Sequence, residues 1–194
     1  MGKLQPSDLM TLETYAKARA DFRQDVMAHK KPRRIPIGEH ISLYFEDRLT
    51  MHYQVQEILR TEKIFEEDEI RQELEAYNPL IPDGTNWKAT MMIEYVDVDE
   101  RRAALAQLTG IQDVVAAMVG TLDPVFGIAN EDLDRETEEK TSSVHFLRFE
   151  LTSSHIEALK GGESLHFSVN HPKYDFATDN LSGPQRDSLI ADLD

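Results

Sequence analysis

The chain has 194 residues, of which 36 are acidic and 21 basic, so its formal net charge is -15, and it contains no cysteine. A chain of this length forms about one domain, which buries roughly 70% of its unfolded surface. The absence of cysteine excludes disulfides, thiol nucleophiles, thiolate zinc sites and cysteine-ligated iron–sulfur clusters. The acidic excess argues against a nucleic acid partner, because lysine and arginine supply most of the affinity for phosphate backbones.

The charge is unevenly distributed along the chain. Residues 1–34 hold 8 basic and 4 acidic side chains, which gives them +4 and leaves -19 for the remainder. The run Lys30–Arg34 falls at the expected end of a helix, where the helix dipole favours cations. The alternative is that this run docks an acidic partner or an anion.

No apolar run reaches the ~20 residues that span a bilayer, and the N-terminus lacks an apolar signal region. We therefore expect a cytoplasmic protein without a membrane partner. We also expect one domain over residues 1–194, made of a basic helical section (1–34), a central α+β core (35–151) and a C-terminal elaboration (152–194).

The first half of the chain predicts helices on either side of one strand. Residues 7–31 have apolar side chains near helical spacing, which predicts one or two helices with Ser7 as the N-cap. Residues 35–46 alternate apolar and polar side chains, which predicts one strand with a bulge at Gly38 that turns Glu39 away from the core. After a turn at residues 47–50, two further helices are expected at 51–63 and 67–77.

The second half predicts strands joined by turns and short helices. Asp97 or Asp99 caps a helix through Leu108, Thr152 starts another, and a terminal helix covers 185–193. Residues 130–143 carry six acids and two bases, which predicts an exposed loop. The expected strands are 89–96, 114–119, 125–129, 144–151 and 165–169. Because this order lacks regular βαβ alternation, we expect an α+β fold, with N-terminal helices packed on a largely antiparallel, twisted sheet.

An unusual set of polar side chains falls in residues 45–63, FEDRLTMHYQVQEILRTEK. On a helix, Glu57 and Arg60 share one face, while Gln54 and Gln56 flank the apolar stripe. Buried amides require hydrogen-bond partners. Three interpretations stay open: an internal polar network at the strand-to-helix corner, a solvated face, or a ligand site. The candidate ligand-binding residues are Glu46, Arg48, Gln54, Gln56, Glu57, Arg60, Glu62 and Arg148.

His145 falls at the inward end of the apolar face of strand 144–151, so it either bonds a structural partner or serves as a base or ligand. The catalytic candidates are Glu57, Arg60 and His145. Any metal would need histidine and carboxylate ligands, for which the candidates are His145, His171, Glu57 and Glu94. Because 7 histidines and 36 acids give many accidental combinations, we expect no cofactor.

Several segments resemble an uncharacterised bacterial family catalogued only as a domain of unknown function. They are IGEHISLYFEDRLTMHYQVQEILRTEKIFEEDEIRQELEAYNPLIP, TMMIEY and SSVHFLRFEL. Members of the family read much like FENR, QIQEMLR with a following Glu, ELxxYN with LIP, and VHYLRF. The resemblance runs from about Ser7 to Leu151, with Asp47 in place of the Asn of FENR. The matched positions are Glu46, Arg48, Gln54, Gln56, Glu57, Arg60, Glu62, Glu73, Asn78, Glu94, His145 and Arg148, and after Leu151 the match thins to HPxY at His171, Pro172 and Tyr174.

Genes of this family tend to lie beside rubrerythrin-like and heterodisulfide-reductase-like iron–sulfur proteins, which implies work in electron transfer or peroxide defence. Our first hypothesis is a non-enzymatic accessory or regulatory protein that binds such a redox protein; a homodimer is kept open as well. The second is a metal-binding protein or an enzyme for an anionic substrate. Its site would be the corner from Glu46 to Arg60, with Arg48 and Arg60 clamping a carboxylate or phosphate and His145 as base or ligand. We favour the first.

Overall fold

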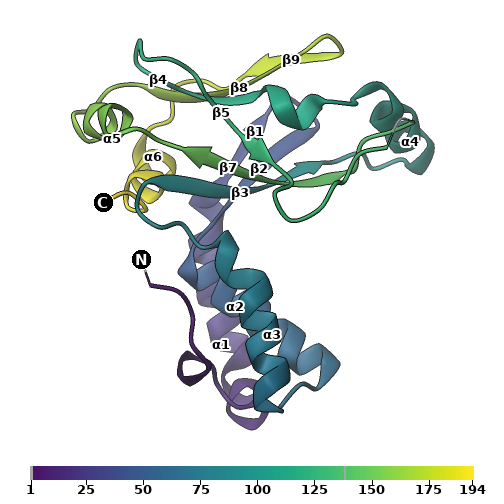
Figure 1. The fold of residues 1–194 in the computed structure, drawn as a ribbon, viewed down its shortest axis with the longest axis vertical. Helices are drawn as coiled ribbons and strands as arrows, with labels where there is room; N and C mark the ends of the chain where they lie inside the picture. Colours follow the sequence, from purple (N-terminus) through teal and green to yellow (C-terminus); the bar gives the residue numbers. More distant parts are fainter. Residues whose placement is uncertain (1, 138) are drawn as a thin grey trace.

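The computed structural model describes residues 2–137 and 139–194, and it confirms the α+β class (Figure 1). A body of antiparallel strands lies at the top of Figure 1, and a lobe of three helices projects below it. The helices are α1 (Leu12–Lys30), α2 (Arg48–Glu62), α3 (Glu67–Tyr77), α4 (Val98–Gln107), α5 (Ser153–Lys160) and α6 (Gly183–Ile190), with short 3-10 turns η1 (Pro6–Asp8), η2 (Lys31–Arg33), η3 (Asn78–Leu80) and η4 (Ile111–Val114). The strands are β1 (Arg34–Ile37), β2 (Ile41–Glu46), β3 (Asn86–Ile93), β4 (Val115–Val119), β5 (Val125–Phe126), β6 (Ile128–Ala129), β7 (Val144–Glu150), β8 (Leu165–His171) and β9 (Tyr174–Ala177).

The strands form two sheets that bury a core between them. One sheet has the order β1-β2-β3-β7-β6 and the other β5-β4-β8-β9, and all the paired strands are antiparallel. Because side chains alternate along a strand, the odd-numbered residues of β2, β3 and β7 point into the core. Phe45, Trp87 and Phe149 of the first sheet surround Phe167 of the second, with ring centroids 5.1–6.0 Å from it. The segment 152–194 therefore supplies two strands of the second sheet, β8 and β9, and with them part of this core.

The helical lobe has an apolar core of its own. Met51, Val55 and Leu59 of α2 pack with Leu74 of α3 and with Leu4 of the N-terminal segment. Burial of this stripe explains why α2 forms over a sequence with many polar residues. None of the helices in the described part of the chain combines the length and apolar character needed to cross a membrane.

Two helix starts differ from the prediction. Ser7 lies in the 3-10 turn η1, and Thr11 caps α1 by accepting a hydrogen bond from the backbone N–H of Thr14. The predicted turn at residues 47–50 is instead the first turn of α2, because Asp47 and Thr50 form a reciprocal capping box. A local cap thus decides each boundary that the apolar spacing leaves open.

The predicted single strand at residues 35–46 is wrong. The chain reverses at Gly38 (φ +70°), so β1 and β2 form a hairpin and not one strand with a bulge. The Tyr174 hydroxyl seals the turn: it donates to the Ile37 carbonyl at 2.6 Å and accepts the backbone N–H groups of His40 and Ile41. The partner that fixes this turn lies over 130 residues away in the sequence.

Most other elements follow the prediction with shifted ends, but the predicted single strand 125–129 is wrong, because it divides into β5, which pairs with β4 in the second sheet, and β6, which pairs with β7 in the first. The helices at 67–77 and 153–160 are confirmed, and Asp97 caps α4. The predicted strand 89–96 begins at Asn86 and ends at Ile93, and β9 was not predicted. The acidic segment between β6 and β7 has no regular secondary structure in its described residues.

Candidate functional site

A polar side chain of α2 is hydrogen-bonded to α1. Glu57 accepts hydrogen bonds from Nε and Nη2 of Arg19, both at 2.8 Å, and from the Tyr15 hydroxyl. The Arg19 guanidinium holds the pKa of Glu57 below its usual range, and burial raises the pKa of Tyr15. The carboxylate of this candidate catalytic residue is thus engaged between two helices.

Two more of the predicted site residues fasten the N-terminal segment to α2. Gln56 is fully buried; its Oε1 accepts the backbone N–H of Met10 at 2.6 Å, and its Nε2 donates to the Met10 carbonyl at 3.2 Å. Arg48 donates to the Gly2 carbonyl at 3.1 Å and pairs with Asp8 at 2.8 Å. These contacts correspond to the internal polar network among the three interpretations.

The remaining candidates within residues 45–63 lie in three different environments: one is buried, one lines a cavity and two are exposed to solvent. The buried carboxylate of Glu46 accepts the hydroxyls of Thr50 (2.7 Å) and Thr90 (2.9 Å). Gln54 lines a cavity. Two residues, Arg60 and Glu62, are exposed on α2.

His145 is bonded within its own sheet and loop. Its Nδ1 lies 3.0 Å from the Asn130 amide nitrogen, and its Nε2 lies 3.0 Å from the Ser142 carbonyl and 2.9 Å from the Thr141 hydroxyl. This pairing suits a neutral imidazole, and burial lowers the pKa of His145. None of these contacts involves α2, so the structure does not join His145 to the polar corner.

The candidate metal ligands are held in separate contacts. His171 bonds the Thr109 carbonyl through Nε2, Glu94 binds Arg34, and Glu57 binds Arg19. Across residues 2–137 and 139–194, no group of three histidine or acidic side chains converges in a way that could hold a metal ion. The described residues thus do not assemble the predicted ligand set.

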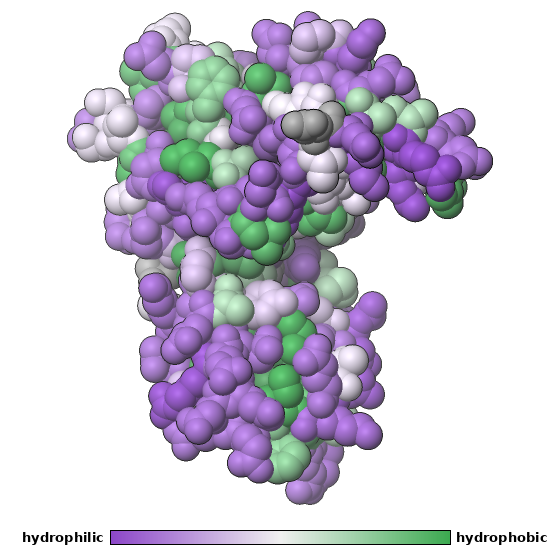
Figure 2. Space-filling view, turned by 45° about the vertical axis from the view of Figure 1, so that its right-hand side comes forward, coloured by the Kyte–Doolittle hydropathy of each residue, from purple (hydrophilic) through white to green (hydrophobic). Residues whose placement is uncertain are grey.

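Two cavities lie where the helical lobe meets the outer face of the first sheet. One cavity of about 750 Å³ is bounded by the end of α1, by η2, and by α2, η3 and the sheet; we call it the basic chamber, after Lys30, Lys31 and Arg34 at its wall. A second cavity of about 580 Å³ lies between α3 and β7. Tyr77, Leu80 and Phe146 line both, so the two cavities adjoin, and we call them together the groove. Figure 2 shows white and green atoms at the narrow waist between the two parts of the molecule.

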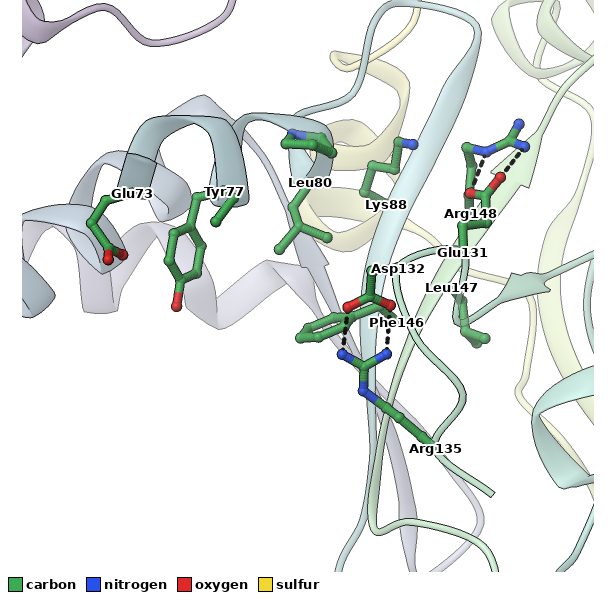
Figure 3. Close-up of a pocket in the computed structure, with 12 residues that line it drawn as sticks. Glu73, Tyr77, Leu80, Lys88, Glu131, Asp132, Arg135, Phe146, Leu147 and Arg148 are labelled. Carbon is green, nitrogen blue, oxygen red and sulfur yellow. Dashed lines mark hydrogen bonds and ion pairs between the residues drawn. The ribbon is translucent and has the colours of Figure 1, made fainter. Parts of the chain in front are cut away.

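Ion pairs line the second cavity (Figure 3). Arg148 binds Glu131 through two contacts of 2.8 Å and also contacts Glu150. Asp132 binds Arg135 at 2.5 and 2.6 Å, and this guanidinium lowers the pKa of Asp132 to about 2. Arg148, a predicted ligand-binding residue, therefore lies at a cavity wall, but its guanidinium is paired with the carboxylates of Glu131 and Glu150.

Lys88 and Glu73 add charges to the same cavity. Burial and the nearby Arg148 lower the pKa of Lys88, which makes no ion pair with any described residue. On the opposite wall, burial raises the pKa of Glu73.

Acidic residues gather in two segments, 96–100 at the start of α4 and 131–137 after β6, which we together call the acidic surface. The Gly110 N–H, beyond the end of α4, donates to Glu136 at 2.6 Å, and Glu131 and Asp132 also line the second cavity. Val96 is fully exposed, and more than half of the surface of Val98 and of Leu133 is accessible. Apolar side chains surrounded by carboxylates are typical of contact surfaces.

Comparisons with known proteins place the chain in a family. Residues 3–193 match the family described as "Protein of unknown function (DUF3501)". The chain belongs to the DUF3501 family. A crystal structure described as a novel protein of unknown function from Burkholderia pseudomallei K96243 is 49% identical, covers 100% of both chains and has a TM-score of 0.93. Comparison with curated proteins gives no match.

This result confirms the resemblance to a family of unknown function, while the redox association of DUF3501 proteins stays a prediction. Of the positions that carry the resemblance, some line the groove in this DUF3501 chain and others hold the lobe together. Those at the groove are Glu46, Gln54, Glu73 and Arg148.

Sequence reasoning missed most of the groove. Tyr44, Lys88, Met92 and Phe146 line it from the outer face of the first sheet. Tyr44, Met92 and Phe146 are even-numbered residues of predicted strands, so their shared face was readable from the alternation, whereas Lys88 precedes the predicted strand 89–96. The sequence could not show that the helices leave this face partly uncovered, because that depends on how the helical lobe packs against the sheet.

Proposed function

We propose that this chain is a non-enzymatic accessory protein that binds a redox partner, an iron–sulfur or rubrerythrin-like protein, through its acidic surface. The observation that carries the proposal is the exposure of Val96, Val98 and Leu133 among carboxylates. Exposed apolar anchors supply affinity once they are desolvated, and the surrounding charge orients the partner. The redox class of the partner rests on the family resemblance.

The contacts of the predicted catalytic residues favour binding over catalysis. A general base needs a free lone pair within reach of a substrate proton. Glu57 is occupied by Arg19 and Tyr15, and the imidazole of His145 is bonded at both nitrogens. An enzyme built on these two groups would have to break structural contacts in each turnover.

The charge distribution also suits an accessory role. Glu131 and Asp132 are paired with Arg148 and Arg135, but the net charge of the acidic surface stays negative, so it attracts a basic patch on a partner and accelerates the encounter at low salt. Such steering weakens above about 0.15 M ionic strength, where the screening length is about 8 Å. Binding is therefore expected to be salt-sensitive.

The test is capture from native lysate at low salt, with the retained proteins identified by mass spectrometry. We expect the native chain to retain an iron–sulfur or rubrerythrin-like protein, and Asp99→Lys/Glu100→Lys to lose it. The matched control is Asp68→Lys/Glu69→Lys, which makes the same charge change on exposed positions of α3. Retention of neither class, or equal retention by both double variants, would contradict the proposal.

A further inference from the structure

The basic chamber combines an adaptable apolar lining with free positive charge. Three of the 7 methionines, Met27, Met51 and Met92, line it together with the aromatic rings of Tyr44 and Tyr77. Methionine is flexible and polarisable, so such a wall adapts to apolar groups of different shapes. A volume of about 750 Å³ lies within the range of small-molecule sites, which is roughly 300–1,000 Å³.

The cations of the chamber differ in how strongly they are engaged. Arg34 is held by Glu94 at 3.1 Å and lies over the Tyr44 ring, with 5.6 Å from Cζ to the ring centroid. Lys30 and Lys31 make no ion pair or side-chain hydrogen bond with the described residues. Two lysines thus remain to bind an anion at the mouth of the chamber.

A carboxylate inside the chamber limits the charge of the ligand. Glu46 lines the wall, and its two oxygens are bonded to the hydroxyls of Thr50 and Thr90, which carry no charge. A dianion such as a phosphate monoester would be repelled by this residue more strongly than a monoanion.

We propose that the basic chamber binds a small monoanionic carboxylate with an apolar body, such as a medium-chain acyl or an aryl carboxylate. The carboxylate is bound by Lys30 and Lys31, and the apolar body lies between the methionines and the outer face of the sheet. The adjoining second cavity leaves room for longer bodies. No residue of the acidic surface lines the basic chamber itself, so this proposal stands independently of the partner role.

The first experiment measures the affinity for decanoate by isothermal titration calorimetry at pH 7. Affinity is expected to rise about two- to fourfold per methylene from hexanoate to decanoate, and to fall at least about tenfold with the uncharged decanamide. Lys30→Gln/Lys31→Gln should weaken decanoate binding to a similar extent. The matched control is Lys173→Gln, an exposed lysine in the turn between β8 and β9, which should leave the affinity unchanged.

The second experiment locates the ligand without relying on a lysine variant. Methyl NMR of labelled methionines should show decanoate-induced shifts at Met27, Met51 and Met92 and none at Met118 of β4 in the second sheet. Met27→Trp, at a position that is 37% exposed, should fill the mouth and block binding. No binding of decanoate, shifts confined to Met118, or equal affinity in the native protein, the lysine double variant and Met27→Trp would overturn the proposal.

Discussion

Replacement of Arg33 by methionine should be among the most destabilising single changes in this chain. The guanidinium is 3% exposed and donates to Asp192 at 2.6 and 3.3 Å. It also donates to the carbonyls of Phe45, Glu46 and Ser188 at 3.0–3.1 Å, so it joins η2, β2 and α6. Removal of one partner of a buried ion pair leaves an uncompensated charge and costs about 3–5 kcal/mol.

For a chain of this size, that loss lowers Tm by roughly 6–20 °C, since each kcal/mol corresponds to about 2–4 °C. Urea unfolding followed by tryptophan fluorescence measures it directly. Trp87 is the single tryptophan, is fully buried, and donates its indole N–H to the Leu189 carbonyl of α6 at 2.8 Å. Its emission therefore reports on the region that Arg33 holds.

The neighbouring Arg34→Met is the matched control. Arg34 is 50% exposed and pairs with Glu94, so its loss should cost less than about 1 kcal/mol. Arg33→Met/Asp192→Leu should recover part of the stability, because the buried Asp192 carboxylate is then no longer left without its cation. Equal costs for the two single variants, or no recovery in the double variant, would refute the reasoning.

Three further predictions concern stability. Gly38→Ala should lower the free energy of unfolding by about 1–3 kcal/mol, because a Cβ there would lie 2.6 Å from the Tyr174 hydroxyl at φ +70°. Gly162→Ala, with open space around it at φ +95°, should lower it less. The reverse order in urea unfolding would count against this explanation. Burial lowers the pKa of His145 below its usual 6.5, so its contribution to stability is complete above pH 6.5 and is lost as the pH falls from there toward the lowered value. His145→Gln should flatten the decline below about pH 6.5 in thermal melts, and an unchanged pH profile would be inconsistent with a buried neutral imidazole. Glu57→Gln should cost about 1–2 kcal/mol through the lost charge-assisted bonds, and a cost under about 0.5 kcal/mol would mean that the pair behaves as an exposed one.

Local signals in the sequence were sufficient for most helices and for the strands of the core. The apolar spacing of residues 67–77 predicted α3, and Asp97 and Thr152 marked the starts of α4 and α5, because these caps act on backbone groups within one turn. The hairpin at Gly38 was not predicted, since its sealing partner is Tyr174. A contact between residues far apart in the sequence leaves no local pattern.

The candidate site shows the same division. The sequence by itself determined the chemical inventory: no cysteine chemistry, a basic N-terminal section set against an acidic remainder of the chain, and polar residues at 45–63 that needed partners. Only the tertiary structure decided that Glu57 bonds α1, that Gln56 bonds the N-terminal segment and that His145 is bonded within its own sheet and loop. The groove depends most on the tertiary structure. Its walls belong to two parts with separate apolar cores, and the way these parts pack together leaves the outer face of the first sheet partly uncovered.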